Sequence, residues 1–446
     1  MTLRFGTDGV RGVANLDLTP ELVVALGRAA ARVLGGDRFV VGRDPRVSGP
    51  LLEAALAAGL ASEGATVESL GVVPTPAVAH ACALEGVPGA MISASHNPFP
   101  DNGIKLFSAG GRKLSDDVEA RLEATLDALV HGATPGDQAR TGTDVGALVA
   151  APEHVLSYAD SVVASLQGRD LAGLRLVVDC ANGSASTVAP FVLRSLGAEI
   201  EVLHATPDGT NINDGCGSTH PDDLRAAVVA HGADAGLAFD GDADRVLAVD
   251  ADGEVVDGDQ VIAICALDLH ERGALKADTV VVTVMTNLGF RLAMEQHGIA
   301  VVETAVGDRY VLDALDAQGL SLGGEQSGHV ILTEHLPTGD GLATALAVLR
   351  AMATTGRELG DLAAALTTFP QTLVNVRVKT KTPIEDVPAI QAAIADVEAA
   401  LLGRGRVLVR YSGTEPLLRV MIEGEDQATV QAWAEEIAEA VRTTLG

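Results

Sequence analysis

Apolar, β-rich runs alternate with helical patterns of apolar residues along most of the chain. Helical patterns cover 20–34, after Thr19 as an N-cap, and 49–64, after Ser48 as an N-cap. Strand-like runs occupy 38–41, 175–178, 198–203, 279–285 and 374–378. Because strands separated by helices are joined by parallel βαβ crossovers, the pattern predicts α/β layers and argues against all-α and all-β folds.

Composition changes along the chain predict four domains. The polar stretch 131–146, rich in Gly, Thr and Pro, is typical of a loop at a domain border. Near the C-terminus the order becomes strand, helix, hairpin and helix, at 372–379, 384–402, 406–423 and 428–445. The predicted fold class is α/β, with three consecutive α/β-layer domains with mixed sheets and a smaller C-terminal α+β domain around a central cleft. The predicted boundaries are 1–150, 151–252, 253–368 and 369–446.

Length and charge narrow the classes of function. The chain has 446 residues, 47% of them hydrophobic and 20% charged, so it can bury large cores and does not have the composition of a disordered protein. Its formal net charge of −29 repels nucleic-acid phosphates and anionic lipid headgroups, which argues against nucleic-acid and membrane partners. The first residues lack a signal-peptide pattern, and no apolar run reaches the roughly 18 residues of a membrane span. A cytoplasmic protein is therefore expected.

The four cysteines lie far apart in the sequence and show no C-x-x-C spacing. This distribution fits neither a disulfide scaffold nor a zinc site, so the favoured interpretation is that they are small apolar core residues. They are Cys82, Cys180, Cys216 and Cys265.

The strongest chemical signal is the segment 240–245 (DGDADR), which lies between two apolar runs. Three alternating carboxylates on a tight turn between strands can converge on one hard cation. An EF-hand calcium loop is a poor match, because Arg245 and Ala251 occupy its glycine and glutamate positions. A solvated acidic hairpin is the alternative. Three Asp ligands suit Mg²⁺ in phosphoryl transfer, with Arg245 beside the metal to hold a phosphate.

A second signal is 91–98 (MISASHNP), followed by 101–105 (DNGIK), where an apolar strand end runs into a polar loop. Such a loop is a natural place to expose the hydroxyl of Ser95. A serine-hydrolase elbow is absent, and taken alone Ser95 reads as an ordinary loop serine. Together with a metal loop, it becomes a candidate to accept and return a phosphoryl group. For His96, a catalytic role and a simple hydrogen-bonding role stay equally open.

Two further loops carry polar side chains suited to a phosphorylated sugar. In 323–329 (GGEQSGH), Glu325, Ser327 and His329 can face a polyol, although an exposed β-turn is the alternative. In 410–416 (RYSGTEP), backbone N–H groups, hydroxyls and arginines form an anion nest. Nucleotide fingerprints are missing, so ATP and NAD are not implied.

Six ordered motifs, spanning essentially the whole chain, resemble the α-D-phosphohexomutase superfamily. Within it, the sequence is similar to the bacterial phosphoglucosamine mutases. The motifs are FGTDGVRG at 5–12, ISASHNPFPDNGIKLF at 92–107, DGDADR at 240–245, VGDRY at 306–310, GEQSGH at 324–329 and RYSGTEPLLRV at 410–420. Related phosphomannomutases and phosphoglucomutases differ at 306–310 and between Glu325 and Ser327, so these places carry the substrate assignment.

The resemblance implies a role for each matching residue. Ser95 would be the phosphoserine, and Asp240, Asp242 and Asp244 would bind Mg²⁺ together with a phosphate oxygen on Ser95. Asp308 and Arg309 lie where the subfamily differs, and our hypothesis is that Asp308 reads a 2-amino group. The reacting phosphate would be surrounded by Arg11, Lys105 and Arg245, and the proton would be transferred by Lys105, His96 or His329. The sugar hydroxyls would be bound by Glu325 and Ser327. The phosphate that is not reacting would be bound by Arg410, Ser412, Gly413, Thr414 and Arg419.

The implied activity is interconversion of glucosamine 6-phosphate and glucosamine 1-phosphate. A sugar 1,6-bisphosphate, both intermediate and activator, would turn around before returning a phosphoryl group to the serine. The product would feed UDP-N-acetylglucosamine and cell-wall synthesis, and the family suggests a homodimer. The sequence leaves open whether a kinase or autophosphorylation first loads the serine. A phosphomannomutase or phosphoglucomutase, a Mg²⁺-dependent sugar phosphatase and a non-enzymatic cation buffer are the alternatives.

Overall fold

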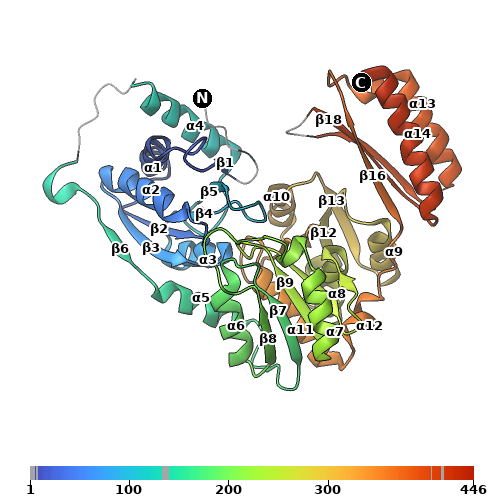
Figure 1. Cartoon of the computed structure of the whole chain (residues 1–446), viewed down its shortest axis with the longest axis horizontal. Coiled ribbons are helices and arrows are strands. Elements are labelled where there is room, and N and C mark those ends of the chain that lie inside the picture. The colour runs from blue at the N-terminus through green and yellow to red at the C-terminus, as the bar shows by residue number, and fades with distance from the viewer. Residues whose placement is uncertain (1–5, 7–8, 133–139, 403, 413–415) are drawn as a thin grey trace. The chain divides into compact units, whose positions relative to one another are not determined.

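The computed structural model describes residues 6, 9–132, 140–402, 404–412 and 416–446 (Figure 1). The chain divides into two compact units, Met1–Met285 with Ile299–Ala365, and Thr286–Gly298 with Leu366–Gly446. The larger unit contains three mixed sheets with helices and the smaller unit an antiparallel sheet with helices, which confirms the predicted fold class. Among the described residues, no helix has the length and apolar character to cross a membrane.

The first sheet is mixed, with a parallel centre and antiparallel strands at one side. Helices α1 (Pro20–Leu34), α2 (Gly49–Ser62) and α4 (Asp116–Val130) share one core with it. Helices α3 (Thr75–Glu85) and α5 (Glu153–Ala164) lie on the opposite face (Figure 1). The strands in spatial order are β1 (Val10–Val13), β5 (Asp101–Phe107), β4 (Gly89–Ile92), β2 (Arg38–Arg43), β3 (Thr66–Val72) and β6 (Leu148–Ala150).

The two predicted helix caps have different outcomes. Thr19 caps α1, because its hydroxyl accepts a hydrogen bond from the backbone N–H of Leu22 at 3.4 Å. Ser48 occupies the predicted N-cap position of α2, but its side chain makes no cap hydrogen bond. The Ser48 hydroxyl instead accepts the Asn102 amide of β5 at 2.9 Å, a tertiary contact that replaces the local one. Helix α2 ends at Ser62, ahead of the predicted end at 64.

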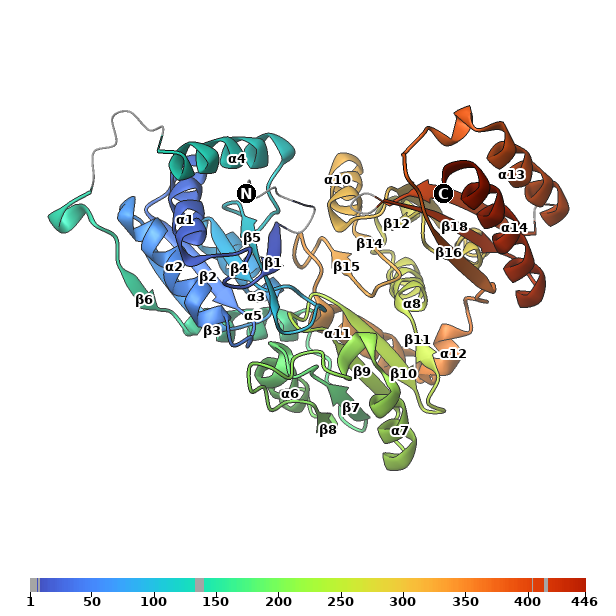
Figure 2. The ribbon, with the colours of Figure 1, turned by 45° about the horizontal axis from the view of Figure 1, so that its top comes forward.

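The second and third sheets complete the larger unit (Figure 2). In both, parallel strands next to an antiparallel hairpin confirm the predicted mixed sheets. The second contains β11 (Val255–Val256), β10 (Val246–Asp250), β9 (Ala235–Phe239), β7 (Arg175–Asp179) and β8 (Glu199–Leu203), with helices α6 (Ala185–Ser195) and α7 (Asp222–His231). The third contains β13 (Ala300–Thr304), β12 (Thr279–Thr283), β14 (Leu322–Gly324) and β15 (Val330–Leu332), with helices α8 (Gly258–Glu271), α10 (Asp308–Gln318), α11 (Gly341–Thr355) and α12 (Leu359–Ala363).

The smaller unit has the predicted order of strand, helix, hairpin and helix. Its antiparallel sheet runs β16 (Gln371–Arg377), β18 (Leu417–Glu423), β17 (Arg406–Tyr411). Helices α13 (Pro388–Leu401) and α14 (Gln427–Leu445) cover one face of it (Figure 1).

The sequence patterns did not predict that α9 (Leu288–Gln296) belongs to the smaller unit. The side chain of Asn287, which precedes this helix, donates to the carbonyl of Phe369 at 2.9 Å and accepts from its N–H at 3.0 Å. These two bonds tie the helix to the chain leading into β16. The four-domain division at 150, 252 and 368 stays a prediction.

Candidate active site

Three buried aspartates occupy the turn between β9 and β10. The two strands pair with Phe239 opposite Val246, so 240–245 is the predicted hairpin turn. Asp240, Asp242 and Asp244 each offer a carboxylate oxygen within 4.8 Å of the others. Asp240 and Asp242 are 0% exposed. A solvated acidic hairpin, the alternative interpretation of this segment, is therefore excluded.

The charges of this turn favour a bound cation. Burial, with the charges of Asp244 and Asp242, raises the pKa of Asp240 well above its ordinary value. Burial also opposes ionisation of Asp242, but the nearby Lys105 ammonium lowers the pKa of that carboxyl. Within the described residues, one oxygen of Asp242 and one of Asp244 are buried without a hydrogen-bond partner. A buried all-oxygen donor set with unsatisfied carboxylates fits Mg²⁺.

Ser95 lies against this turn. Its hydroxyl donates to a carboxylate oxygen of Asp240 at 2.5 Å, across 145 positions of sequence. The prediction of an exposed hydroxyl was wrong, because Ser95 is 0% exposed. Its backbone has φ of 53°, a left-handed conformation that costs a non-glycine residue about 1 kcal/mol. The packing of the loop therefore holds this serine beside the carboxylates.

Arg46 is the main anchor of the Ser95 loop, and the motif analysis did not identify it. Its guanidinium, 0% exposed, donates to the Asp44 carboxylate at 2.8 Å. It also donates to four loop carbonyls, those of Ser95, Asn97, Pro98 and Asp101, at 2.9, 2.8, 2.5 and 3.0 Å. The positions of these residues could have identified it, because Asp44 and Arg46 follow β2, and the Ser95 loop follows β4. Strands β2 and β4 are parallel neighbours, so the loops after them lie at the same edge of the sheet.

His96 and Arg245 form the other side of the Ser95 hydroxyl. The ring Nδ1 of His96 lies 3.4 Å from Ser95 Oγ and 3.2 Å from an Arg245 guanidinium nitrogen. Burial, reinforced by the charges of Arg245 and Arg11, lowers the pKa of His96 to about 4. The imidazole is therefore neutral at neutral pH.

We expect the NMR chemical shifts of the His96 ring carbons, in the unphosphorylated and metal-free protein, to change with a midpoint near pH 4. The signals are assigned by their loss in His96→Gln. Because the folded-state pKa lies below the ordinary 6.5, the unfolded chain binds more protons between these values. The stability contributed by neutral His96 is therefore complete above about pH 6.5 and is lost as the pH falls toward 4. A midpoint above 6.5 would contradict this account.

Lys105 and His329 reach the same aspartates. The Lys105 ammonium, 3% exposed, donates to Asp242 at 2.9 Å and to Asp244 at 3.0 Å. His329 is buried, and its Nε2 lies 4.0 Å from Asp244. A β-bridge between Arg245 and His329 joins the aspartate turn at 240–245 to the loop at 324–329. Arg11 lies on β1 opposite Gly103 and is half-buried.

The predicted sugar loop is the turn between β14 and β15. A Glu325 carboxylate oxygen accepts the backbone N–H of Gly307 at 3.1 Å, whereas Ser327 is exposed. Asp308 opens α10, pairs with Lys113, and lies 3.6 Å from Nε2 of His329.

Arg309 does not join this group. Its guanidinium instead pairs with two carboxylates of α4, those of Asp116 and Glu119.

The predicted distal-phosphate residues lie in the smaller unit. Arg410 and Arg419 are directly opposite each other on β17 and β18. Burial, with the charge of Arg419, lowers the pKa of Arg410. Like charges placed opposite each other are unfavourable until an anion binds between them. Gly413 and Thr414 lie outside the described residues.

One more cation lies at this turn. Lys381, which the sequence motifs did not single out, donates to the backbone carbonyl of Ser412 at 2.6 Å.

Family models of phosphoglucomutase/phosphomannomutase match four successive stretches of this chain. They are α/β/α domain I at 2–131, α/β/α domain II at 156–253, α/β/α domain III at 257–369 and the C-terminal domain at 373–440. The chain belongs to the phosphoglucomutase/phosphomannomutase family. The resemblance found in the motifs is confirmed.

Relatives of this family member cover its full length. The phosphoglucosamine mutase of Frankia casuarinae is 55% identical over 458 residues, which cover 100% of this chain and 99% of the relative. The phosphoglucosamine mutase of Symbiobacterium thermophilum is 55% identical over 453 residues, covering 100% of both chains.

Solved structures show the same fold. A phosphoglucomutase/phosphomannomutase family protein of Burkholderia thailandensis aligns with a TM-score of 0.80 at 26% identity, over 98% of this family member and 97% of that chain. The Aspergillus fumigatus N-acetylphosphoglucosamine mutase, in complex with GlcNAc-6P and magnesium, aligns with a TM-score of 0.71 at 20% identity, over 100% and 96% of the two chains. At that identity the second likeness supports the fold alone.

Proposed function

We propose that this family member is an isomerase that interconverts glucosamine 6-phosphate and glucosamine 1-phosphate through a phosphoserine at Ser95. The observation that carries the proposal is the buried Ser95 hydroxyl held at 2.5 Å from Asp240, in a turn of three clustered carboxylates. A phosphoryl-carrying serine needs a cation and basic residues close by, and no hydrolase triad. The full-length relatives at 55% identity are phosphoglucosamine mutases, which supports the choice of sugar.

Two transfers make up the proposed reaction. In the first, the bond between phosphorus and Ser95 Oγ breaks as a bond to the free sugar hydroxyl forms, which gives the 1,6-bisphosphate. The hydroxyl proton passes to His96 or His329, or to Lys105 after its ammonium has released a proton. In the second, the other phosphate of the bisphosphate returns to Ser95 and the proton goes back to the leaving sugar oxygen.

Electrostatic positioning is the main task of the surrounding residues. Asp240, Asp242 and Asp244 would hold Mg²⁺, which supplies charge neutralisation for a transferring phosphoryl group when it is bound. Arg245 and Arg11 add positive charge around Ser95. The arginine pair at 410 and 419, with Ser412, Gly413 and Thr414, would bind the phosphate that is not reacting. This second phosphate site must accept either end of the sugar, because the bisphosphate turns around between the transfers.

The same proposal includes the location, the oligomeric state and the activation of the enzyme. We place the enzyme in the cytoplasm, as a homodimer that uses small sugar phosphates and no nucleic-acid or membrane partner. A sugar 1,6-bisphosphate would serve as activator, and a kinase or autophosphorylation would load Ser95 first.

A coupled assay of glucosamine 1-phosphate formation, run with a parallel assay for inorganic phosphate, tests the proposed reaction. Isomerised product without phosphate release supports the mutase. Stoichiometric phosphate release would instead establish the phosphatase alternative. Higher kcat/KM for mannose or glucose phosphates than for glucosamine phosphate would favour the phosphomannomutase or phosphoglucomutase alternative.

Asp308→Asn is expected to lower kcat/KM for glucosamine 6-phosphate about tenfold more than for glucose 6-phosphate. The reason is that a carboxylate pairs with a protonated 2-amino group but gains little from a 2-hydroxyl, and a hydrogen bond to a charged group contributes about 1.5–3 kcal/mol. Asp313→Asn, on the same helix, is the matched control. Equal losses for both sugars would show that Asp308 does not read the amino group.

A further inference from the structure

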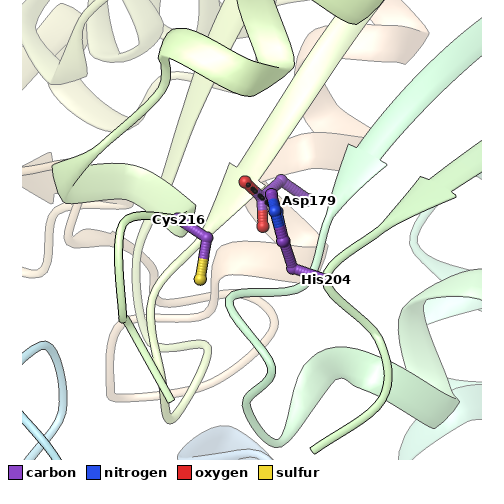
Figure 3. A group of neighbouring side chains, drawn as sticks. All are labelled: Asp179, His204 and Cys216. Carbon is purple, nitrogen blue, oxygen red and sulfur yellow. Dashed lines mark ion pairs between the residues drawn. The ribbon is translucent and has the colours of Figure 1, made fainter. Parts of the chain in front are cut away.

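A second group of metal-ligating side chains lies at the ends of two strands of the second sheet. Asp179 ends β7, and His204 directly follows β8, the parallel neighbour of β7. Cys216 comes from the loop that leads to α7. One ligand atom from each of these residues lies within 4.8 Å of the others (Figure 3). The fold thus brings together the aspartate, histidine and cysteine that the sequence keeps apart.

The contact between His204 and Asp179 is at ion-pair distance but is not a hydrogen bond. Nδ1 of His204 lies 3.1 Å from an oxygen of Asp179, yet this buried ring nitrogen makes no hydrogen bond within the described residues. The carboxylate oxygens of Asp179 are held in place by the backbone N–H groups of Ala181 at 2.8 Å and Gly217 at 2.9 Å. Each oxygen keeps a second lone pair for a cation.

The other ring nitrogen of His204 lies near a second carboxylate, as in many histidines that bind a metal. Nε2 lies 3.4 Å from a carboxylate oxygen of Asp223. A histidine that binds a metal through one nitrogen usually donates its other N–H to a carboxylate, which fixes the tautomer and raises the basicity of the ligand. His204 therefore faces the cluster with one nitrogen and a supporting carboxylate with the other.

We propose that Asp179, His204 and Cys216 form a site for a thiophilic divalent cation of the Zn²⁺ class, separate from the aspartate turn. Sulfur and imidazole ligands select Zn²⁺ over Mg²⁺, and three protein ligands leave the fourth tetrahedral position to water. Cys216 loses its thiol proton to solvent as the bond between sulfur and the metal forms. The His204 side chain is 26% exposed, so the cluster lies close to the surface.

The bound cation would stiffen the support of the Ser95 loop. Asn213, on the same loop as Cys216, donates its amide to the carbonyls of Ser95 and Asn97 at 2.9 and 3.2 Å. Gly217, next to Cys216, packs so closely on Phe239 that a Cβ there would meet its carbonyl at 2.6 Å. A cation that pins Cys216 to the ends of β7 and β8 thus restrains both loops of the proposed active site.

Titration of the chelator-treated, full-length protein with Co²⁺ in excess Mg²⁺ tests the site. We expect a sulfur-to-cobalt charge-transfer band that Zn²⁺ removes by displacement. Cys216→Ser should lose the band, whereas Cys265→Ser, a buried cysteine of α8, should keep it. Asp240→Asn should also keep the band, which separates this site from the aspartate turn and from the proposed reaction.

A partly exposed ligand provides the second variant, for use if Cys216→Ser does not fold. His204→Gln should weaken Co²⁺ binding at least about 10-fold while the circular dichroism spectrum is retained. A wild-type protein without the charge-transfer band, or a band that persists in Cys216→Ser, would overturn the proposal. Unchanged Co²⁺ affinity in His204→Gln would overturn it as well, and would leave His204 as a simple ion-pair partner of the two aspartates.

Discussion

Ser95→Ala is expected to lower the mutase rate on the order of 10⁶-fold, the loss seen when a catalytic nucleophile is removed from an enzyme. The proposed reaction forms a covalent bond to Ser95 Oγ, so no neighbouring group can replace the hydroxyl. Intact mass of the purified proteins gives an independent readout. Wild-type protein should contain a fraction heavier by one phosphoryl group, and Ser95→Ala should contain none.

Ser93→Ala is the matched control for Ser95→Ala. Ser93 is also buried, but its hydroxyl donates to Asp44 at 2.6 Å and accepts the backbone N–H of Ser95 at 2.9 Å. This variant should keep the phosphorylated fraction on Ser95 while losing thermal stability. Full isomerase activity in Ser95→Ala would refute the phosphoserine mechanism.

The chemistry of the site was predictable because each motif is short and contiguous. The three aspartates of 240–245 lie on one turn, and a strand end at 92 followed by Ser95 marks a loop at a sheet edge. The contact between Ser95 and Asp240 joins two loops from different sheets, which the chemistry of the two motifs and the resemblance to a family suggested but no local pattern could show. The local pattern also suggested an exposed hydroxyl, because it contains no information about the groups that bury the loop.

Contacts between residues far apart in the chain were not predicted, because local patterns contain no information about them. The cap at Thr19 depends on a backbone group three positions away, whereas Ser48 found a partner on another element. The four cysteines are free and buried, as predicted, but spacing rules search for metal ligands close together in the chain and so did not group Cys216 with other ligand types. Asp179 and His204 become its neighbours only through the parallel pairing of β7 and β8.

Charge shows the difference between a whole chain and a site. A formal net charge of −29 argues against extended anionic partners such as nucleic acid. Positive groups nevertheless lie around Ser95: Arg46 contacts its backbone carbonyl, and Arg245 contacts the neighbouring His96. The ammonium of Lys105 contacts Asp242 of the acidic turn. A small phosphorylated substrate responds to this local field, which the whole-chain charge does not describe.

Arg46→Met is expected to lower the free energy of unfolding of the larger unit by about 3–5 kcal/mol, because it leaves the buried Asp44 carboxylate without its cation. Arg43→Met is the control, since that arginine is partly exposed in its pair with Glu53 and its loss should cost less stability than the loss of the fully buried Arg46. Urea denaturation measures both variants. The kcat of Arg46→Met should also fall, because the loop carbonyls of Ser95, Asn97, Pro98 and Asp101 lose their shared donor.

The pH dependence and a double variant identify the cause of the Arg46→Met loss. Burial already raises the pKa of Asp44, and the arginine counteracts that rise. Without Arg46 the folded protein binds a proton at Asp44 more readily than the unfolded chain, so the loss of stability should shrink as the pH falls. Adding Asp44→Asn removes the buried charge and should recover part of the lost stability at neutral pH. If the double variant were no more stable than Arg46→Met, the loss would come from the loop carbonyls and not from the unpaired carboxylate.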